Sequence, residues 1–395
     1  MDDGTRISPE VEKFLRSAKA GDVTTCTAML KENSELINCQ EAGGYCALHF
    51  AASTGNCSFI RFLCSNGADV NLENCDGNPP VIIAIRCRQM GSLQELISAG
   101  ADLQWRSSSG ASVSHYAASE GNLQFLDLLV QHGAPTSFEK CKAGSLLHWA
   151  CHSSSVECVG TILYKYKVDV NAEDEHGGTP LLTAIFMKAK ELAEFLLDNG
   201  ANPNVQVKED GTTPLHIAAD LGLNDTVRTL CYAGADRQKK NTEGKTPQDI
   251  ATEGGKVLVV KELVKEPLTA EQIESETTRL KLQGNKCFEK REFVKAIKFY
   301  SLAIQMNGKN HVFFSNRAAC YFHQGNYSLA LFDAERCIIL NPSWFKGYLR
   351  KSAALLALRK YAEATAAAEA GLKENPKHAE LEEMLKSIKK QKESI

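Results

Sequence analysis

The chain has 395 residues, of which 43% are hydrophobic and 24% charged, a balance typical of a folded globular protein and not of a disordered one. Its formal net charge of -3 argues against binding nucleic acid or a membrane surface through overall charge. No stretch reaches the ~18 consecutive apolar residues of a membrane span. Since the acidic, polar N-terminus does not resemble a signal peptide, we expect a cytoplasmic protein that can also pass to the nucleus.

A period of about 33 residues runs through the first two thirds of the chain. One alanine of this repeat recurs in register, at Ala51, Ala84, Ala117, Ala150, Ala184, Ala218 and Ala251. The clearest unit reads Thr-Thr-Pro-Leu-His-Ile-Ala-Ala from Thr212 to Ala219. A proline in the first turn, such as Pro214, is compatible with a helix start, and a glycine such as Gly200 is a usual helix end. A unit of this size cannot bury its apolar face alone, so we expect the units to stack into a solenoid.

Four histidines recur at one position of the repeat: His49, His115, His148 and His216. Equivalent side chains of stacked repeats lie ~10 Å apart, which is too far for a shared metal ion. We therefore expect these rings to hydrogen-bond loop backbone and predict no metal site. The sequence also shows no nucleophile with its base and no phosphate-binding glycine loop, which predicts no catalytic residues, no cofactor and no enzymatic activity.

The period of 33, with its Thr-Pro-Leu-His and Gly-Ala-Asp phrases, resembles the ankyrin repeat. The resemblance covers roughly residues 9–266, as an N-terminal capping unit and seven repeats. The second repeat departs from the pattern, since Gly77–Ile83 contains neither threonine nor histidine. We predict an ankyrin repeat domain over residues 1–267.

A second helical repeat, of 34 residues, begins after Pro267, where Thr269 can cap a new helix. Small residues recur at two of its positions, at Gly284, Ala318 and Ser352 and at Ala296, Ala330 and Ala364. This pattern resembles the tetratricopeptide repeat (TPR). We predict a TPR domain over residues 268–395, with repeats at about 277–310, 311–344 and 345–378 and a capping helix at 379–393. The predicted fold class is all-α, with two helical solenoids.

The two predicted domains differ in charge. Residues 268–395 contain 21 Lys and Arg against 14 Asp and Glu, whereas residues 1–267 contain 24 against 34. The net charges are therefore +7 and -10. Fourteen cysteines, none in a C-x-x-C pair, are interpreted as small buried side chains and not as disulfides or zinc ligands.

Basic and amide side chains recur on the first predicted helix of each TPR unit. Lys281 and Asn285 are four residues apart, as are Lys346 and Arg350, so each pair shares a helix face. Asn316 takes the corresponding place in the second unit. If all five point into one groove, they form a set of donors without an acid, which suits a ligand with closely spaced carboxylates.

Three segments, Leu280–Lys286, His311–Arg317 and Trp344–Lys351, resemble the motifs of chaperone-binding TPR domains. The closest likeness is to the first such domain of the co-chaperone that organises the two major heat-shock chaperones. In that family these five positions form a two-carboxylate clamp that grips the terminal aspartate of a Glu-Glu-Val-Asp tail. The resemblance implies a carboxylate clamp made of Lys281, Asn285, Asn316, Lys346 and Arg350. Phe313 and Phe314 are interpreted as repeat core, with packing on the bound peptide as the alternative.

The resemblance implies a non-enzymatic adaptor or co-chaperone. Its TPR groove is expected to bind the tail of heat shock protein 90 and/or 70 family chaperones, and its ankyrin array a client or scaffold protein. The order of the two domains is similar to that of ankyrin–TPR proteins found notably in plants and protists. The alternative is an interaction scaffold of another pathway, whose groove takes a different acidic C-terminus. No nucleic acid partner is expected. The hairpin tips expected to contact a client include Asp76, Asn78, Glu209, Asp210 and Glu243.

Overall fold

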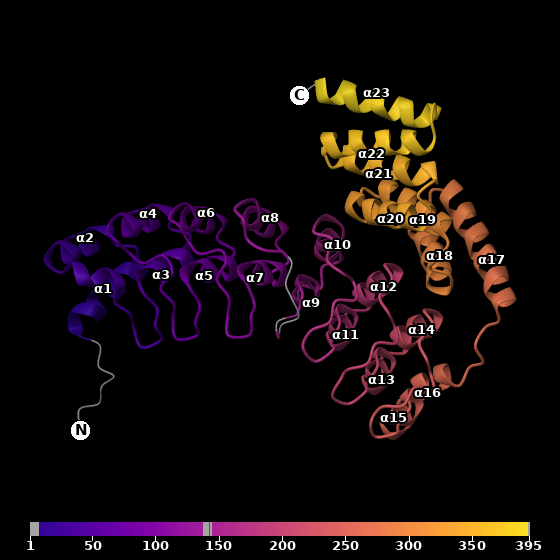
Figure 1. The fold of residues 1–395 in the computed structure, drawn as a ribbon, viewed down its shortest axis with the longest axis horizontal. Coiled ribbons are helices and arrows are strands. Elements are labelled where there is room, and N and C mark those ends of the chain that lie inside the picture. The colour runs from indigo at the N-terminus through magenta and orange to yellow at the C-terminus, as the bar shows by residue number, and fades with distance from the viewer. Residues whose placement is uncertain (1–7, 137–141, 143, 394–395) are drawn as a thin grey trace. The chain divides into compact units, whose positions relative to one another are not determined.

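A computed structural model describes residues 8–136, 142 and 144–393, and every regular element in these ranges is helical (Figure 1). Among these residues the one strand-like pairing is an isolated bridge between Arg106 and Ser112. The predicted all-α fold class is confirmed.

The first sixteen α-helices of the described residues come in pairs of short helices, with one 3-10 helix, η1, after the first pair. Their bounds are α1 (Pro9–Ala20), α2 (Val23–Glu32), η1 (Ser34–Asn38), α3 (Ala47–Thr54), α4 (Cys57–Ser65), α5 (Pro80–Arg86), α6 (Met90–Ser98), α7 (Val113–Ser119), α8 (Leu123–Gln131), α9 (Leu146–His152), α10 (Val156–Lys165), α11 (Pro180–Phe186), α12 (Lys190–Asp198), α13 (Pro214–Asp220), α14 (Asn224–Tyr232), α15 (Pro247–Glu253) and α16 (Val257–Leu263). Each pair after the first matches one 33-residue period.

Longer helices follow, as three pairs and a final single helix. Their bounds are α17 (Ala270–Glu289), α18 (Phe293–Met306), α19 (His311–His323), α20 (Tyr327–Leu340), α21 (Phe345–Ala357), α22 (Tyr361–Glu374) and α23 (Ala379–Glu393). Their core includes a cluster of Leu280, Phe313 and Phe314 with Ile304 and Cys337. The burial of both phenylalanines supports their interpretation as repeat core.

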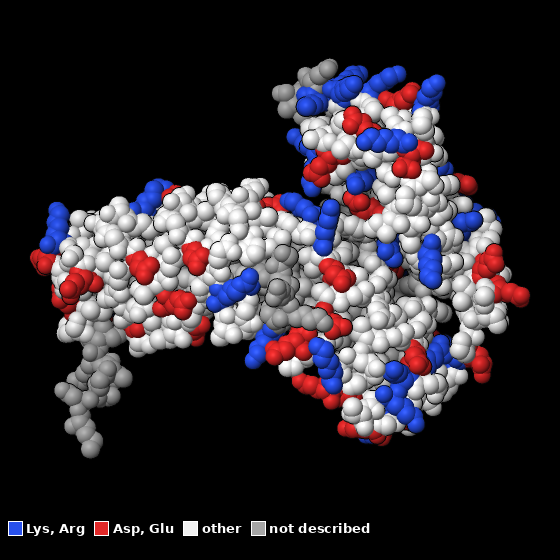
Figure 2. Space-filling model, in the orientation of Figure 1, with Lys and Arg blue, Asp and Glu red and all other residues white. Residues whose placement is uncertain are grey.

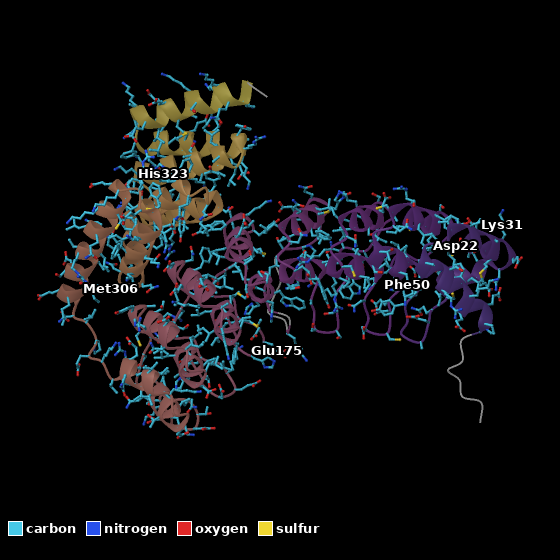
Figure 3. All side chains as sticks on the ribbon, turned by 180° about the vertical axis from the view of Figure 1, so that it is seen from behind. Asp22, Lys31, Phe50, Glu175, Met306 and His323 are labelled. Carbon is cyan, nitrogen blue, oxygen red and sulfur yellow. The ribbon has the colours of Figure 1, made fainter. Side chains whose placement is uncertain are left out.

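Local side-chain chemistry explains where the short helices begin. Thr213 caps α13, and the ring of His216 completes the capping box: its Nδ1 accepts the backbone N–H of Thr213 at 3.2 Å. The ring's Nε2 donates to the carbonyl of Lys245, in the next repeat, at 3.0 Å. His49 and His115 make the same two contacts, so the prediction that these rings hydrogen-bond loop backbone is confirmed. At the N-terminal end Asp22, labelled in Figure 3, caps α2 by accepting from the N–H of Thr25.

A glycine two residues beyond the second helix of a pair ends five of the repeats. These are Gly67, Gly100, Gly133, Gly200 and Gly234, with φ between +88° and +92°. Other residues rarely adopt this left-handed conformation, so the predicted role of these glycines as helix ends is confirmed.

Two expectations about particular residues are wrong. Asn78, expected at an exposed hairpin tip, is only 6% exposed, because its carbonyl accepts from His49 and its N–H is bound by Asn74. No disulfide joins the cysteines of the described residues, but Cys75 and Cys87 are exposed, not buried, because one lies in a tip and the other directly follows α5.

The chain divides into two compact units, which we describe separately. One comprises Met1–Cys158 with Ala172–Glu175; the other comprises Val159–Asn171 with His176–Ile395. The second unit therefore contains the later short helix pairs together with all seven long helices. The division at residue 267 is based on sequence repeats and stays a prediction.

Candidate functional site

The five residues of the predicted clamp lie on α17, α19 and α21, the first helices of the three long pairs. Lys281 and Asn285 are one turn apart on α17, and Lys346 and Arg350 are one turn apart on α21. The structure brings two of the five into direct contact: Asn316 Nδ2 donates to Asn285 Oδ1 at 3.4 Å. In the described part of the chain, neither hydrogen bonds nor ion pairs join the three cations to these amides.

A buried tyrosine orients the Asn285 amide. Tyr300, from α18, is 2% exposed and donates its hydroxyl to Asn285 Oδ1 at 2.7 Å. Burial raises the pKa of Tyr300, so the hydroxyl stays protonated and able to donate at neutral pH. Because two donors already occupy the carbonyl oxygen, the Nδ2 group of Asn285 is the part of the amide left to bind a ligand acceptor.

Arg350 is the most buried of the three cations in the predicted clamp. Its Nε atom is buried and has no hydrogen-bond partner among the described residues. Burial lowers the pKa of Arg350, while the nearby carboxylate of Glu380, on α23, opposes that effect. Burying a charged N–H donor without an acceptor raises the free energy of the folded protein. An anion that binds there supplies the missing acceptor, so its binding is favoured. Arg350 is therefore suited to receive a ligand carboxylate.

The two lysines complete the charge of the site from more exposed positions. Lys346 is exposed and Lys281 half-buried. Among the described residues, no carboxylate lies within ion-pair distance of Lys281, Lys346 or Arg350. Basic side chains also gather over α23 (Figure 2), where Lys390 and Lys392 lie in the last turn. The field around these helices therefore favours an acidic ligand.

Sequence reasoning missed Tyr300 and Glu380 as residues that shape this site. Tyr300 had a detectable signal, because its ring packs against Gly284: a Cβ atom there would lie 2.6 Å from Tyr300 Cε1. A small residue followed sixteen residues later by a large one, as in Gly284 and Tyr300, predicts that the two side-chain positions pack together. The sequence contains no such indication for Glu380, because it lies on the final helix α23, outside the three repeats.

The described residues contain no cluster of three or more His, Cys, Asp or Glu side chains that could hold a metal ion. Within the same residues, no helix has both the length and the apolar character needed to cross a bilayer.

Comparison with known proteins identifies the class of this chain. The family model described as "Ankyrin repeats (3 copies)" matches residues 14–107, 114–207 and 199–275. The matched residues make up more than half of the chain, which therefore belongs to the ankyrin repeat family.

Individual relatives add a second component. The chain is 42% identical over 109 residues to the heat shock protein sti1 homolog of Schizosaccharomyces pombe, which is 28% of this chain and 18% of that protein. It is 36% identical over 143 residues to Hsp70-Hsp90 organizing protein 3 of Arabidopsis thaliana, which is 36% of this chain and 25% of that protein. These matches fit a TPR part, and the predicted resemblance is confirmed.

A third relative matches a longer part of the chain. The chain is 34% identical over 178 residues to the nuclear factor NF-kappa-B p105 subunit of Gallus gallus, which is 44% of this chain and 18% of that protein. The chain spans a quarter or less of the length of each of these three relatives. It is an ankyrin repeat protein with homology to Hsp70-Hsp90 organizing proteins.

Proposed function

We propose that this chain is a non-enzymatic adaptor whose TPR helices bind the C-terminal Glu-Glu-Val-Asp tail of heat shock protein 90 or 70 family chaperones. In this proposal Lys281, Asn285, Asn316, Lys346 and Arg350 form the carboxylate clamp. The observation that carries it is the buried, unpartnered Nε of Arg350, one turn from Lys346 on α21. The homology to Hsp70-Hsp90 organizing proteins supports it.

The proposed recognition depends on a free chain end. A terminal aspartate carries its side-chain carboxylate and the main-chain carboxylate within a few ångströms of each other, and only the last residue of a protein offers both. Arg350 and Lys346 would bind one carboxylate from α21, and Lys281 with the two asparagines would bind the other. Each charge-assisted hydrogen bond contributes about 1.5–3 kcal/mol before desolvation is subtracted.

The ankyrin repeats would hold the client or scaffold protein in this proposal. Their hairpin tips include exposed acidic residues: Asp76, Glu209, Asp210 and Glu243. Because these repeats carry the net negative charge of the chain, a client with a basic surface is the best match. No catalytic residue or cofactor takes part, and the proposed location is the cytoplasm, where the chaperone tails are found.

Calorimetry on the full chain tests the tail-binding proposal. A peptide that ends in Glu-Glu-Val-Asp is titrated in two forms, one with a free C-terminus and one with an amidated C-terminus. We expect binding of the free form and at least tenfold weaker binding of the amidated form. Equal affinities would contradict the clamp. Binding of another acidic terminus in preference to this one would favour the alternative of a scaffold in a different pathway.

A further inference from the structure

A buried ion cluster joins the ankyrin helices to the long helices within the second compact unit. Arg317, on α19, donates from Nε and Nη2 to both carboxylate oxygens of Asp333, on α20, each at 2.8 Å. The same Nη2 donates to Asp198, the last residue of α12, at 2.9 Å, across 119 residues of sequence. The side chains of Arg317, Asp198 and Asp333 are only 7%, 9% and 8% exposed. Arg317 therefore binds two acids from different repeat domains in a largely buried site.

An aromatic contact lies beside this cluster. The ring of Phe332, on α20, stacks on Tyr164 of α10 with centroids 5.7 Å apart, and meets Phe195 of α12 edge-on at 5.8 Å. Phe332 is only 4% exposed, and both of these ring partners belong to ankyrin helices, so the ankyrin helices help to bury it. Gly160, on α10, allows the approach, because a Cβ atom there would overlap the Phe332 ring.

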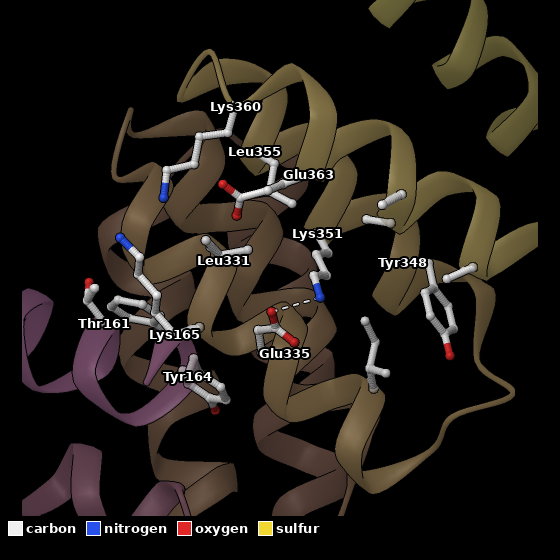
Figure 4. Close-up of a pocket in the computed structure, with 15 residues that line it drawn as sticks. Thr161, Tyr164, Lys165, Leu331, Glu335, Tyr348, Lys351, Leu355, Lys360 and Glu363 are labelled. Atoms are coloured by element: carbon white, nitrogen blue, oxygen red, sulfur yellow. Dashed lines mark ion pairs between the residues drawn. The ribbon is translucent and has the colours of Figure 1, made fainter. Parts of the chain in front are cut away.

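The contact has defined edges. Figure 4 shows one of them, a cleft of about 430 Å³ in which Tyr164 and Lys165 of α10 face α20 and α21. Glu335 of α20 and Lys351 of α21 form an ion pair at 2.8 Å on the TPR side of that cleft. A second cleft of about 300 Å³, between α12, α14 and α18, is lined by Asp198 and Arg336. Phe332 borders the first cleft and Asp198 the second, so the buried contact lies between the two clefts.

We propose that the outer face of α18 and α20 is a docking surface for the chain's own helices α10, α12 and α14, which makes the later ankyrin repeats and the TPR helices one rigid body. If the TPR helices separated from the ankyrin helices, the apolar ring of Phe332 would be exposed to water and Asp198 would lose its cation, Arg317. The occupant of the surface is therefore this chain itself. No other protein can use that face while the contact holds, so partners of the TPR helices must use another face, such as the one where the amides of Asn285 and Asn316 lie. The inference does not depend on which ligand that face binds.

Hydrogen exchange of the full chain, followed by mass spectrometry, tests the inference. In Asp198→Lys a second cation faces Arg317, so amides of α19 and α20 should exchange about tenfold faster or more, although the substitution lies far away in sequence. The matched control is Asp225→Lys, the same charge change on α14, where Asp225 is half exposed and pairs with Lys190 and Arg228 of the ankyrin repeats. This control should leave α19 and α20 unchanged. Faster exchange confined to α12 in Asp198→Lys would overturn the inference.

A variant on the other side of the contact gives an independent result. Phe332→Ala should speed exchange in α10 and α12, because its ring partners Tyr164 and Phe195 lose their cover. Leu356→Ala is the control, since Leu356 packs in a core cluster formed by the TPR helices alone. Unchanged exchange of α10 and α12 in Phe332→Ala would overturn the inference even if Asp198→Lys failed to fold.

Discussion

Asn316 and Arg317 follow one another on α19 but contact different parts of the protein: Asn316 donates to Asn285 of α17, and Arg317 donates to Asp198 of α12. Successive residues of an α-helix point about 100° apart, so a single helix can present one side chain to each surface. A displacement of α19 therefore alters the proposed clamp and the ankyrin contact together.

Arg350→Ala is expected to weaken binding of a Glu-Glu-Val-Asp peptide at least tenfold. The substitution removes a cation whose Nε is already desolvated, and a lost charge-assisted bond costs about 1.5–3 kcal/mol, or roughly 10- to 150-fold in affinity. Calorimetry measures the affinity, and circular dichroism checks that helicity is kept. Lys373→Ala, an exposed cation on α22, is the control and should bind normally. Normal binding by Arg350→Ala would rule out the clamp.

Tyr300→Phe is expected to weaken the same peptide about two- to tenfold. The phenylalanine keeps the packing against Gly284 but removes the hydroxyl that donates to Asn285 Oδ1, so the amide is no longer oriented. The thermal midpoint should change little. Tyr327→Phe provides the comparison, because Tyr327 packs on Phe322 and does not contact the amides. If both variants bind equally well, Tyr300 does not position Asn285.

Much of the fold could be predicted from the sequence, because the information lies within one repeat. The helix start at Pro214 and the helix end at Gly200 depend on residues a few positions away, and the sequence predicts both. For His216 the sequence predicts a hydrogen bond to loop backbone but not its part in the capping box of α13. The prediction that Asn78 is exposed was wrong, because a 33-residue period shows where a hairpin tip lies but does not show which residues of the tip are buried. Asp198 and Arg317 could not be paired from the sequence, because their contact joins two different kinds of repeat across 119 residues.

The ankyrin repeats are expected to lose stability below pH 6.5. Burial lowers the pKa of His49, His115 and His216, and that of His115 to about 4. Between about pH 6.5 and 4 the His115 site therefore binds more protons in the unfolded chain than in the folded one, so acidification favours unfolding by up to about 1.4 kcal/mol per pH unit from this residue. The lowered pKa values of His49 and His216 act in the same direction. Urea unfolding between pH 7.5 and 5 measures the slope. His115→Gln should be less stable at pH 7.5 but should lose less stability on acidification, and an unchanged slope would contradict this origin.

Gly284→Ala is expected to destabilise the TPR helices. The added Cβ would lie 2.6 Å from the buried Tyr300 ring, and overpacking of this kind costs about 1–3 kcal/mol. Alanine regains up to about 1 kcal/mol of helix propensity, so the net change should lower the thermal midpoint by a few degrees. Gly308→Ala, where the nearest atom to the new Cβ is the Ile304 carbonyl oxygen at 3.4 Å, should have a smaller effect. A midpoint lowered equally in both variants would contradict the packing argument.

The fit between Gly160 and Phe332 limits how this chain can be recombined. Repeat domains are commonly treated as cassettes that can be exchanged at a linker such as residues 264–269. Here a transplanted TPR domain without an aromatic residue at position 332 would leave a hole beside Tyr164, and an ankyrin repeat with alanine in place of Gly160 would collide with the ring. The unit that can be inherited or engineered intact thus starts no later than α10 and continues through α20, well upstream of the apparent domain boundary.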